Sequence, residues 1–344
     1  MKEYSIPFNA HDAINSLSKK LGQKLVGDCL ELKLELPKHV GSGTILAFNF
    51  SNGLSLLIFN CQFKSDWNLL FKDQSVPPLQ FNFSIKGGVK HFYNDESINY
   101  FLNPLQGTIT ADIADGLHGF CFPQNQEVVF ASLVLDREQY LKKIDCFMEN
   151  MPEKLTKVFS DVSGGDVFFY QGNYSIASSE CIQSILTNKQ SGIVRSTYIE
   201  GVALELLSSQ IRQFRDDKVP PSKQITLRKY DVEKILEAKR VLIKNIKDPP
   251  TIESLSKEIG INQTKLKSGF KKVFDKPIKS WLRDQRLELA KLLLLEQDMS
   301  IMNIADAVGY TNHSHFSRRF KEKYGVLPSD YAQSIRVKLS DFKP

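Results

Sequence analysis

The 344-residue sequence has no apolar run long enough to cross a bilayer. A membrane-spanning helix needs about 20 predominantly apolar residues, and no stretch of this chain comes close to that length. The first residues, MKEYSIPFNAHDAIN, also lack the charged segment and apolar core of a secretory signal. We therefore expect no membrane span, no signal peptide and a cytoplasmic location.

Cysteine is scarce, and the five residues show no C-x-x-C spacing. An odd number of widely separated cysteines argues against a disulfide framework or a zinc site. It favours buried free thiols, with a redox sensor as the alternative. The five positions are Cys29, Cys61, Cys121, Cys146 and Cys181.

Recognisable catalytic patterns are missing as well. The sequence shows no Ser-His-Asp arrangement, no phosphate-binding glycine loop and no clustered pair of carboxylates. His39, His91 and His118 lack the spacing of a metal-dependent β-barrel enzyme. His313 and His315 are two residues apart, so on a helix their side chains point about 200° apart. We therefore predict no enzyme, no catalytic residue, no metal and no cofactor.

The first third of the chain consists of short runs rich in β-branched and aromatic residues. Apolar and polar residues alternate in them, and glycine or proline separates them, as is typical of strands joined by turns. We predict an α+β multidomain protein that begins with a β jelly-roll, cupin-like sensor domain over residues 1–135. The expected strands are Asp28–Leu36, Gly43–Phe50, Leu54–Phe63, Leu79–Gly87, Val89–Asn94, Gly107–Ile113 and Val128–Leu135.

This expected barrel has room for one small molecule, because small β-barrels hold a single ligand in their interior. Aromatic residues on its strands are candidates to line such a pocket, and packing within the core explains them equally well. The pocket candidates are Phe81, Phe83, Phe92, Tyr93 and Phe122.

Helices are expected over residues 136–222, the longest being Arg195–Phe214. Its apolar residues recur every three or four positions, which gives one apolar stripe. The stripe either covers the barrel or forms a dimer seam, so we assign residues 136–222 to a helical dimerisation segment. It ends in a charged, proline-containing linker, Arg215–Lys223. The seam candidates are Ile199, Val202, Leu206 and Phe214.

Residues 223–344 contain two similar helix-turn-helix units, Thr251–Phe274 and Ser300–Tyr331. In each unit a short apolar-periodic helix ends at a glycine, Gly260 or Gly309, which can adopt the left-handed backbone that ends a helix. Pro277–Gln297 lies between the units as a long helix of about 30 Å, close to the spacing of successive major grooves. The sequence thus predicts two DNA-reading helices one helical turn apart.

Positive charge is concentrated in the same region. Residues 225–344 hold 24 lysines and arginines against 15 aspartates and glutamates, whereas the rest of the chain is slightly acidic. A DNA phosphate backbone would use this basic excess. We therefore expect double-stranded promoter or operator DNA as the partner.

The string from Ser300 to Tyr331 resembles the AraC/XylS family of bacterial transcription regulators. The resemblance rests on Ser300-Ile301-x-x-Ile304-Ala305-x-x-Val308-Gly309-Tyr310, then Phe316-Ser317-Arg318-x-Phe320-Lys321, then Gly325-x-x-Pro328-x-x-Tyr331. The run from Tyr198 to Leu207 is similar to a helix of the pyochelin-type branch, which responds to siderophores, and it implies an iron or siderophore connection.

The resemblance also implies which outward residues of the two reading helices approach DNA. Lysine and arginine can donate to guanine, while serine and threonine can serve several bases. Basic residues farther along each helix more readily hold phosphates. Because Ser268 and Gly269 are small, we expect the first unit to read DNA weakly. Candidate base contacts are Thr264, Lys267, Ser268, His313, Ser314, Ser317 and Arg318; candidate phosphate contacts are Lys271, Lys272, Arg319 and Lys321.

Together these features predict a sequence-specific transcription regulator controlled by a small-molecule effector. A homodimer is expected, with RNA polymerase as a further partner where the protein activates transcription. Two alternatives stay open: an enzyme with a jelly-roll fold whose C-terminus only tethers it to DNA, and a constitutive regulator without a ligand.

Overall fold

A computed structural model describes residues 2–72, 77–93, 99–112, 118–151, 153–172, 174–217, 229–274, 276–296 and 298–333. The chain divides into two compact units, Met1–Gln224 and Ile225–Pro344. Among the described residues, no helix is both long and apolar enough to cross a membrane. Residues 218–223 of the predicted linker lie outside these ranges.

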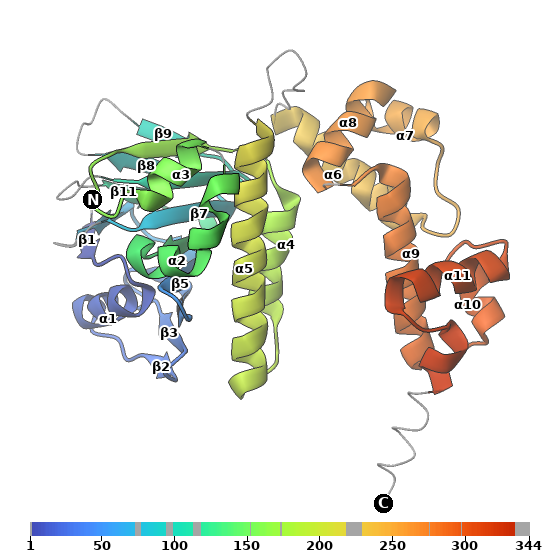
Figure 1. Cartoon of the computed structure of the whole chain (residues 1–344), viewed down its shortest axis with the longest axis horizontal. Coiled ribbons are helices and arrows are strands. Elements are labelled where there is room, and N and C mark those ends of the chain that lie inside the picture. Colours follow the sequence, from blue (N-terminus) through green and yellow to red (C-terminus); the bar gives the residue numbers. More distant parts are fainter. Residues whose placement is uncertain are drawn as a thin grey trace, which may run out of the picture. The chain divides into compact units, whose positions relative to one another are not determined.

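Two β-sheets form the first unit (Figure 1). The five-stranded sheet has the order β1-β6-β11-β8-β9, and the eight-stranded sheet has the order β13-β10-β7-β12-β5-β4-β3-β2. Neighbouring strands are antiparallel except β1 and β6. The strands are β1 (Lys2–Ile6), β2 (Val26–Gly27), β3 (Glu31–Glu35), β4 (Gly41–Asn49), β5 (Leu54–Phe63), β6 (Trp67–Phe71), β7 (Leu79–Lys86), β8 (Val89–Tyr93), β9 (Asn99–Leu102), β10 (Gly107–Ala111), β11 (His118–Phe122), β12 (Glu127–Leu135) and β13 (Phe168–Gln171).

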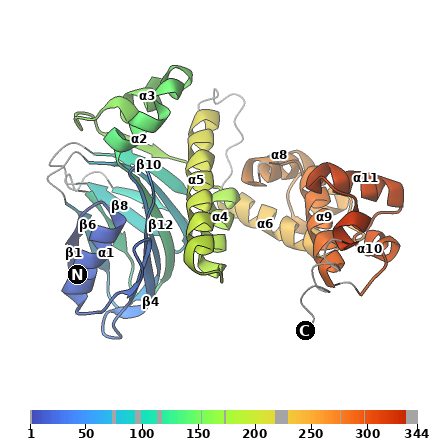
Figure 2. The same ribbon diagram turned by 60° about the horizontal axis from the view of Figure 1, so that its bottom comes forward.

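The eight-stranded sheet is covered on both faces. One apolar core lies between the two sheets and helix α1, and a second lies between the eight-stranded sheet and the helices that follow β12. Figure 2 shows α4 and α5 side by side along this sheet. The helices of this unit are α1 (Ala10–Leu21), α2 (Arg137–Ile144), a 3-10 helix (Asp145–Asn150), α3 (Glu153–Ser160), α4 (Ile176–Thr187) and α5 (Gly192–Asp217).

The apolar stripe of α5 packs on the sheet of its own chain. Ile199 and Leu206 are fully buried in the core between sheet and helices, and Val202 and Phe214 are nearly so. The seam assignment of these residues is therefore corrected. Their side chains are already covered within one chain, so the stripe covers the β-sheet and does not form a dimer seam.

The predicted pocket residues do not come together. Phe81 and Phe83 on β7 point into the core beneath the helices, whereas Phe122 on β11 packs between the two sheets. Gln80 and Asn82 alternate with them on β7, and these polar residues are the ones buried on the face toward the other sheet. Phe92 is half-buried, and the side chain of Tyr93 lies outside the described part of the chain. Among the described side chains, Phe81 and Phe83 therefore share no pocket with Phe122.

The cysteines are free thiols but are not all buried. Cys61 and Cys181 are buried, and burial raises the pKa of each thiol to about 12. Cys29 and Cys146 are exposed, which corrects the expectation for these two positions.

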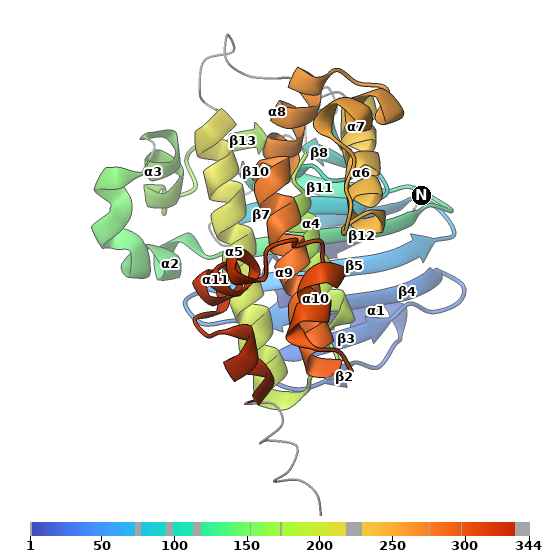
Figure 3. The same ribbon diagram turned by 90° about the vertical axis from the view of Figure 1, so that its right-hand side faces the viewer.

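Helices alone form the described part of the second unit. The first helix-turn-helix comprises α7 and α8, packed on α6. The second comprises α10 and α11, packed on α9 around Phe316 and Phe320. Figure 3 shows α9 running from one pair to the other. The helices are α6 (Lys229–Lys244), α7 (Ile252–Ile259), α8 (Gln263–Phe274), α9 (Ile278–Glu296), α10 (Ile301–Ala307) and α11 (His313–Tyr324).

Candidate nucleic-acid interface

The turn residues set where each reading helix begins. Gly260 adopts a left-handed backbone, with φ of 73°, and ends α7. Asn262 then accepts a hydrogen bond from the Lys265 backbone nitrogen at 2.7 Å, which caps the start of α8. In the second unit Asn312 accepts from the His315 nitrogen at 2.8 Å in the same way. Both asparagines therefore cap the helices that follow them.

Helix α8 is held against α6 by a partly buried ion pair. Lys265 on α8 lies 2.7 Å from Asp231 on α6, and the Asp231 side chain is only 3% exposed. The inward face of α8 is closed by Leu266, Phe270 and other buried apolar residues. These contacts fix the rotation of α8 about its axis, and with it the set of side chains that faces outward.

The outward face of α8 presents Thr264 and Lys267, both exposed. Ser268 is half-buried, and its hydroxyl donates to the Thr264 carbonyl at 2.6 Å. Gly269 is buried, so its lack of a side chain does not alter the outward face. The structure thus leaves Thr264 and Lys267 as the predicted base-contact residues with freely accessible side chains on α8.

Four predicted base-contact residues lie on α11, and they differ in accessibility. Ser314 is exposed, and the Arg318 side chain is 65% exposed, with its Nε 3.8 Å from Glu322. Ser317 is half-buried. His313 is tied back to α10, because its Nε2 lies 3.0 Å from Asp306 Oδ1.

The predicted phosphate contacts also divide into two groups. Lys271 and Lys321 are exposed, whereas Lys272 and Arg319 are half-buried. Arg319 donates to Glu322 at 2.7 Å, and this hydrogen bond lowers the pKa of Glu322. Arg319 is therefore already paired with a carboxylate in the structure, whereas Lys271 and Lys321 are exposed.

Arg286 on α9 is a structural residue of this region that the sequence reasoning missed. Its Nε donates to the Ile246 carbonyl at 2.9 Å, and its Nη2 donates to the Lys247 carbonyl at 3.1 Å. The guanidinium also lies 5.9 Å from the centre of the Tyr310 ring, a cation–π distance. A lone arginine in a helical spacer has no sequence pattern that would have revealed these contacts.

Two family models match the chain. Residues 42–227 match the N-terminal domain of regulatory protein PchR, and residues 255–334 match a helix-turn-helix domain family. The first match alone covers more than half of the chain.

Curated relatives match over part of their length. Regulatory protein PchR of Pseudomonas aeruginosa is 29% identical over 161 residues, which cover 47% of this chain and 53% of PchR. HTH-type transcriptional regulator ExsA of the same species is 32% identical over 23% of this chain and 28% of its own length. The arabinose operon regulatory protein of Escherichia coli is 31% identical over 26% of this chain and 31% of its own. The chain thus spans about half, or less, of these relatives.

Solved structures with similarity include ToxT from Vibrio cholerae with a bound unsaturated fatty acid, at 14% identity. That match covers 83% of this chain and 96% of ToxT, with a TM-score of 0.32. The DNA-binding domain of AdpA in complex with a target DNA matches at 19% identity over 30% of this chain and 95% of that domain, with a TM-score of 0.29. From the family models, the chain belongs to the AraC-type helix-turn-helix regulatory proteins that carry a PchR N-terminal domain.

Proposed function

We propose that this protein is a sequence-specific DNA-binding transcription regulator that reads its operator with α8 and α11. The observation that carries the proposal is the pair of capped helices, each packed on its inner face and each presenting accessible polar and basic residues outward. On α8 these are Thr264 and Lys267, and on α11 they are Ser314 and Arg318. Lys271 and Lys321 supply phosphate contacts beside them.

The first unit is proposed to be a sensor of jelly-roll type. Strands β5 to β12 divide into the sheets β5-β12-β7-β10 and β6-β11-β8-β9; consecutive strands change sheet except at the β8–β9 hairpin, as in two interlocked Greek keys. The similarity to the PchR N-terminal domain supports a regulatory role for this unit. We propose that a small molecule bound there controls DNA binding, in a response with the iron or siderophore connection that the resemblance implies.

Pairing of two chains is part of the proposal, because two weak reading units gain effective concentration when chains associate. The start of α5 offers exposed apolar residues for such pairing, since Ile193 is 74% exposed, Val194 56% and Tyr198 40%. RNA polymerase is the further partner where the regulator activates transcription, and the site of action is the cytoplasm, where promoter DNA lies.

Selection from genomic DNA tests the proposal. Full-length protein is incubated with sheared DNA from its own genome, and the retained fragments are sequenced. We expect a shared motif in two parts about 10 base pairs apart, because α8 and α11 would enter successive major grooves. Retained fragments without any common motif would contradict sequence-specific regulation.

A further inference from the structure

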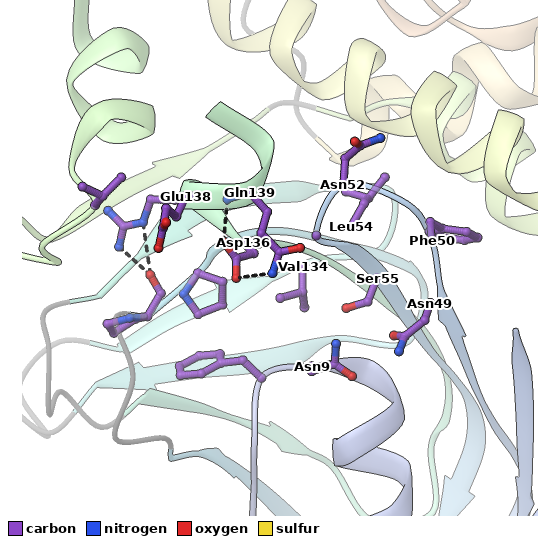
Figure 4. Close-up of a pocket in the computed structure, with 16 residues that line it drawn as sticks. Asn9, Asn49, Phe50, Asn52, Leu54, Ser55, Val134, Asp136, Glu138 and Gln139 are labelled. Atoms are coloured by element: carbon purple, nitrogen blue, oxygen red, sulfur yellow. Dashed lines mark hydrogen bonds between the residues drawn. The ribbon is translucent and has the colours of Figure 1, made fainter. Parts of the chain in front are cut away.

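A pocket opens at one end of the β-sandwich, away from the predicted aromatic residues. It has a volume of about 590 Å³ and lies where the β4–β5 turn meets the starts of α1 and α2 (Figure 4). This volume falls within the range of small-molecule sites. Asn9 caps α1 and Asp136 caps α2 at its rim.

The lining combines apolar side chains with uncharged polar groups. Phe8, Leu54 and Val134 contribute apolar surface. Asn49, Asn52 and Gln139 contribute side-chain amides to the lining, and all three are labelled in Figure 4. The Asn49 Oδ1 atom is buried and has no hydrogen-bond partner within the described part of the chain. Such an acceptor is costly unless a bound donor satisfies it.

The charged groups at the rim are already engaged. Asp136 accepts from the Gln139 backbone nitrogen at 2.9 Å and from the Gln139 side chain at 3.1 Å. Arg137 donates to the Pro77 carbonyl at 2.6 and 3.1 Å and to Asp161 at 3.2 Å. Glu138, which is exposed, accepts from Lys142 at 3.4 Å. A charged ligand would therefore lose hydration here without gaining a dedicated counter-charge.

The pocket also borders the turn that contacts α5. Asn52 and Gly53 line it, and Ser51 in the same turn donates to Glu200 on α5 at 2.7 Å. The Gly53 carbonyl accepts from the Asp136 backbone nitrogen at 2.9 Å, which joins the turn to the start of α2. A ligand that moves this turn therefore also changes its contact with α5, the last helix before residue 218.

We propose that this pocket is the effector site, and that it takes an uncharged small molecule with an apolar ring and an amide or hydroxyl group. The inference rests on the proposed regulatory function, which it deepens by giving the effector a place and a chemical class. Phe8, Leu54 and Val134 contact the ring, while Asn49, Asn52 and Gln139 bond the polar group.

A matched series of probes tests the class of ligand. N-methylbenzamide, benzoate and benzylamine share one ring and differ in charge, and ligand-observed NMR at about 1 mM measures each with the full-length protein. We expect N-methylbenzamide to bind at least about tenfold more tightly than either charged probe, because only the charged probes must give up ion hydration. Equal or weaker binding of the amide, or no detectable binding of any probe, would overturn the proposal.

Two variants locate the binding. Asn52→Gly removes an amide at a position whose φ of 59° glycine tolerates, and Gln139→Ala removes an exposed amide on α2. Each is expected to weaken binding of N-methylbenzamide severalfold, whereas Gln126→Ala, which removes an exposed amide outside the pocket, should leave it unchanged. Binding that neither pocket variant changes would place the probe elsewhere and contradict the site. Genomic DNA selection with the same preparations reports separately on the regulatory function.

Discussion

Arg286 on α9 donates from its Nε to the backbone carbonyl of Ile246, at 2.9 Å, and so joins the helix between the two reading units to the end of α6. The neighbouring Lys247 carbonyl accepts from the same guanidinium, and it also faces Gly309 at the turn of the second unit. A Cβ atom at Gly309 would clash with that carbonyl, and the φ of 84° is itself left-handed. The segment between α6 and α7 therefore contacts both α9 and the turn of the second helix-turn-helix unit.

This contact predicts that Arg286 sets the spacing of the two operator parts. Arg286→Ala should widen the range of spacings that the protein accepts, because the Ile246 and Lys247 carbonyls lose their donor and α9 is held less firmly to the segment before the first unit. Arg283→Ala is the matched control, since no hydrogen bond from Arg283 is found among the residues that the structure describes. Selection on operators with randomised spacers measures the effect; an unchanged spacing preference in Arg286→Ala would limit this residue to stability.

Arg318 and Lys321 should have separable roles on α11. Arg318→Ala is expected to relax the preference at one operator position, at a cost of about 1–3 kcal/mol. Lys321→Ala should weaken binding to all sequences about equally and flatten the salt dependence. Binding selection on randomised operators distinguishes the two, and an unchanged base preference in the Arg318 variant would reassign it to the DNA backbone.

The Arg137–Asp161 pair predicts a pH dependence of stability in the first unit. Burial alone would raise the pKa of Asp161. Hydrogen bonds from the Gly165 nitrogen, the Ser163 hydroxyl and the Asp166 nitrogen, with the charge of Arg137, outweigh burial and hold this pKa far below its usual value. Asp161→Asn should cost about 3 kcal/mol near neutral pH, because Arg137, with a side chain only 2% exposed, loses its counter-ion.

The sign of this effect follows from the lowered pKa. The ionised carboxylate stabilises the fold above the ordinary pKa of about 4, and this contribution is lost as the pH falls toward the lowered value in the folded protein. The difference between wild type and Asp161→Asn should therefore shrink below about pH 4. Urea unfolding across this range measures it, with Glu138→Gln as a control at an exposed ion pair. A pH-independent difference would contradict the electrostatic explanation.

Substitutions along α5 should separate packing from pairing. Leu206→Glu places a charge in the core beneath the helix and is expected to unfold the first unit. Ile193→Glu combined with Val194→Glu changes exposed positions, so the protein should stay folded and sediment as a monomer. A folded double variant that still sediments as a dimer would move the proposed interface away from the start of α5.

Some strands could be predicted from the sequence because turn residues and a continuous apolar run mark where they begin and end. Leu54–Phe63 was predicted with the bounds that β5 has in the structure, since a glycine turn and a buried apolar run define it. Trp67–Phe71 was missed because all five residues of β6 are buried and show no alternation. Phe81 and Phe83 were misplaced because helices cover the outer face of β7, so apolar residues on either face of this strand are buried.

The helix-turn-helix region was more predictable, because its signals are local. Glycine turns and asparagine caps lie within a few residues of the helices that they end or begin, as at Gly260 and Asn312. Contacts such as Arg286 with Ile246 join residues 40 positions apart, and no local pattern encodes them. The open pocket in the first unit likewise depends on the placement of two helix starts and one turn.

The central claim is that the second unit binds DNA through its basic outward faces, and the salt dependence of that binding tests it most directly. Fluorescence anisotropy of the fragment Ile225–Pro344, which is a compact unit of the structure, can be measured with a promoter duplex recovered by genomic selection. With about four phosphate contacts, affinity should fall by roughly two orders of magnitude between about 50 mM and about 200 mM salt. An affinity that cannot be measured at low salt, or that does not change with salt, would contradict the account.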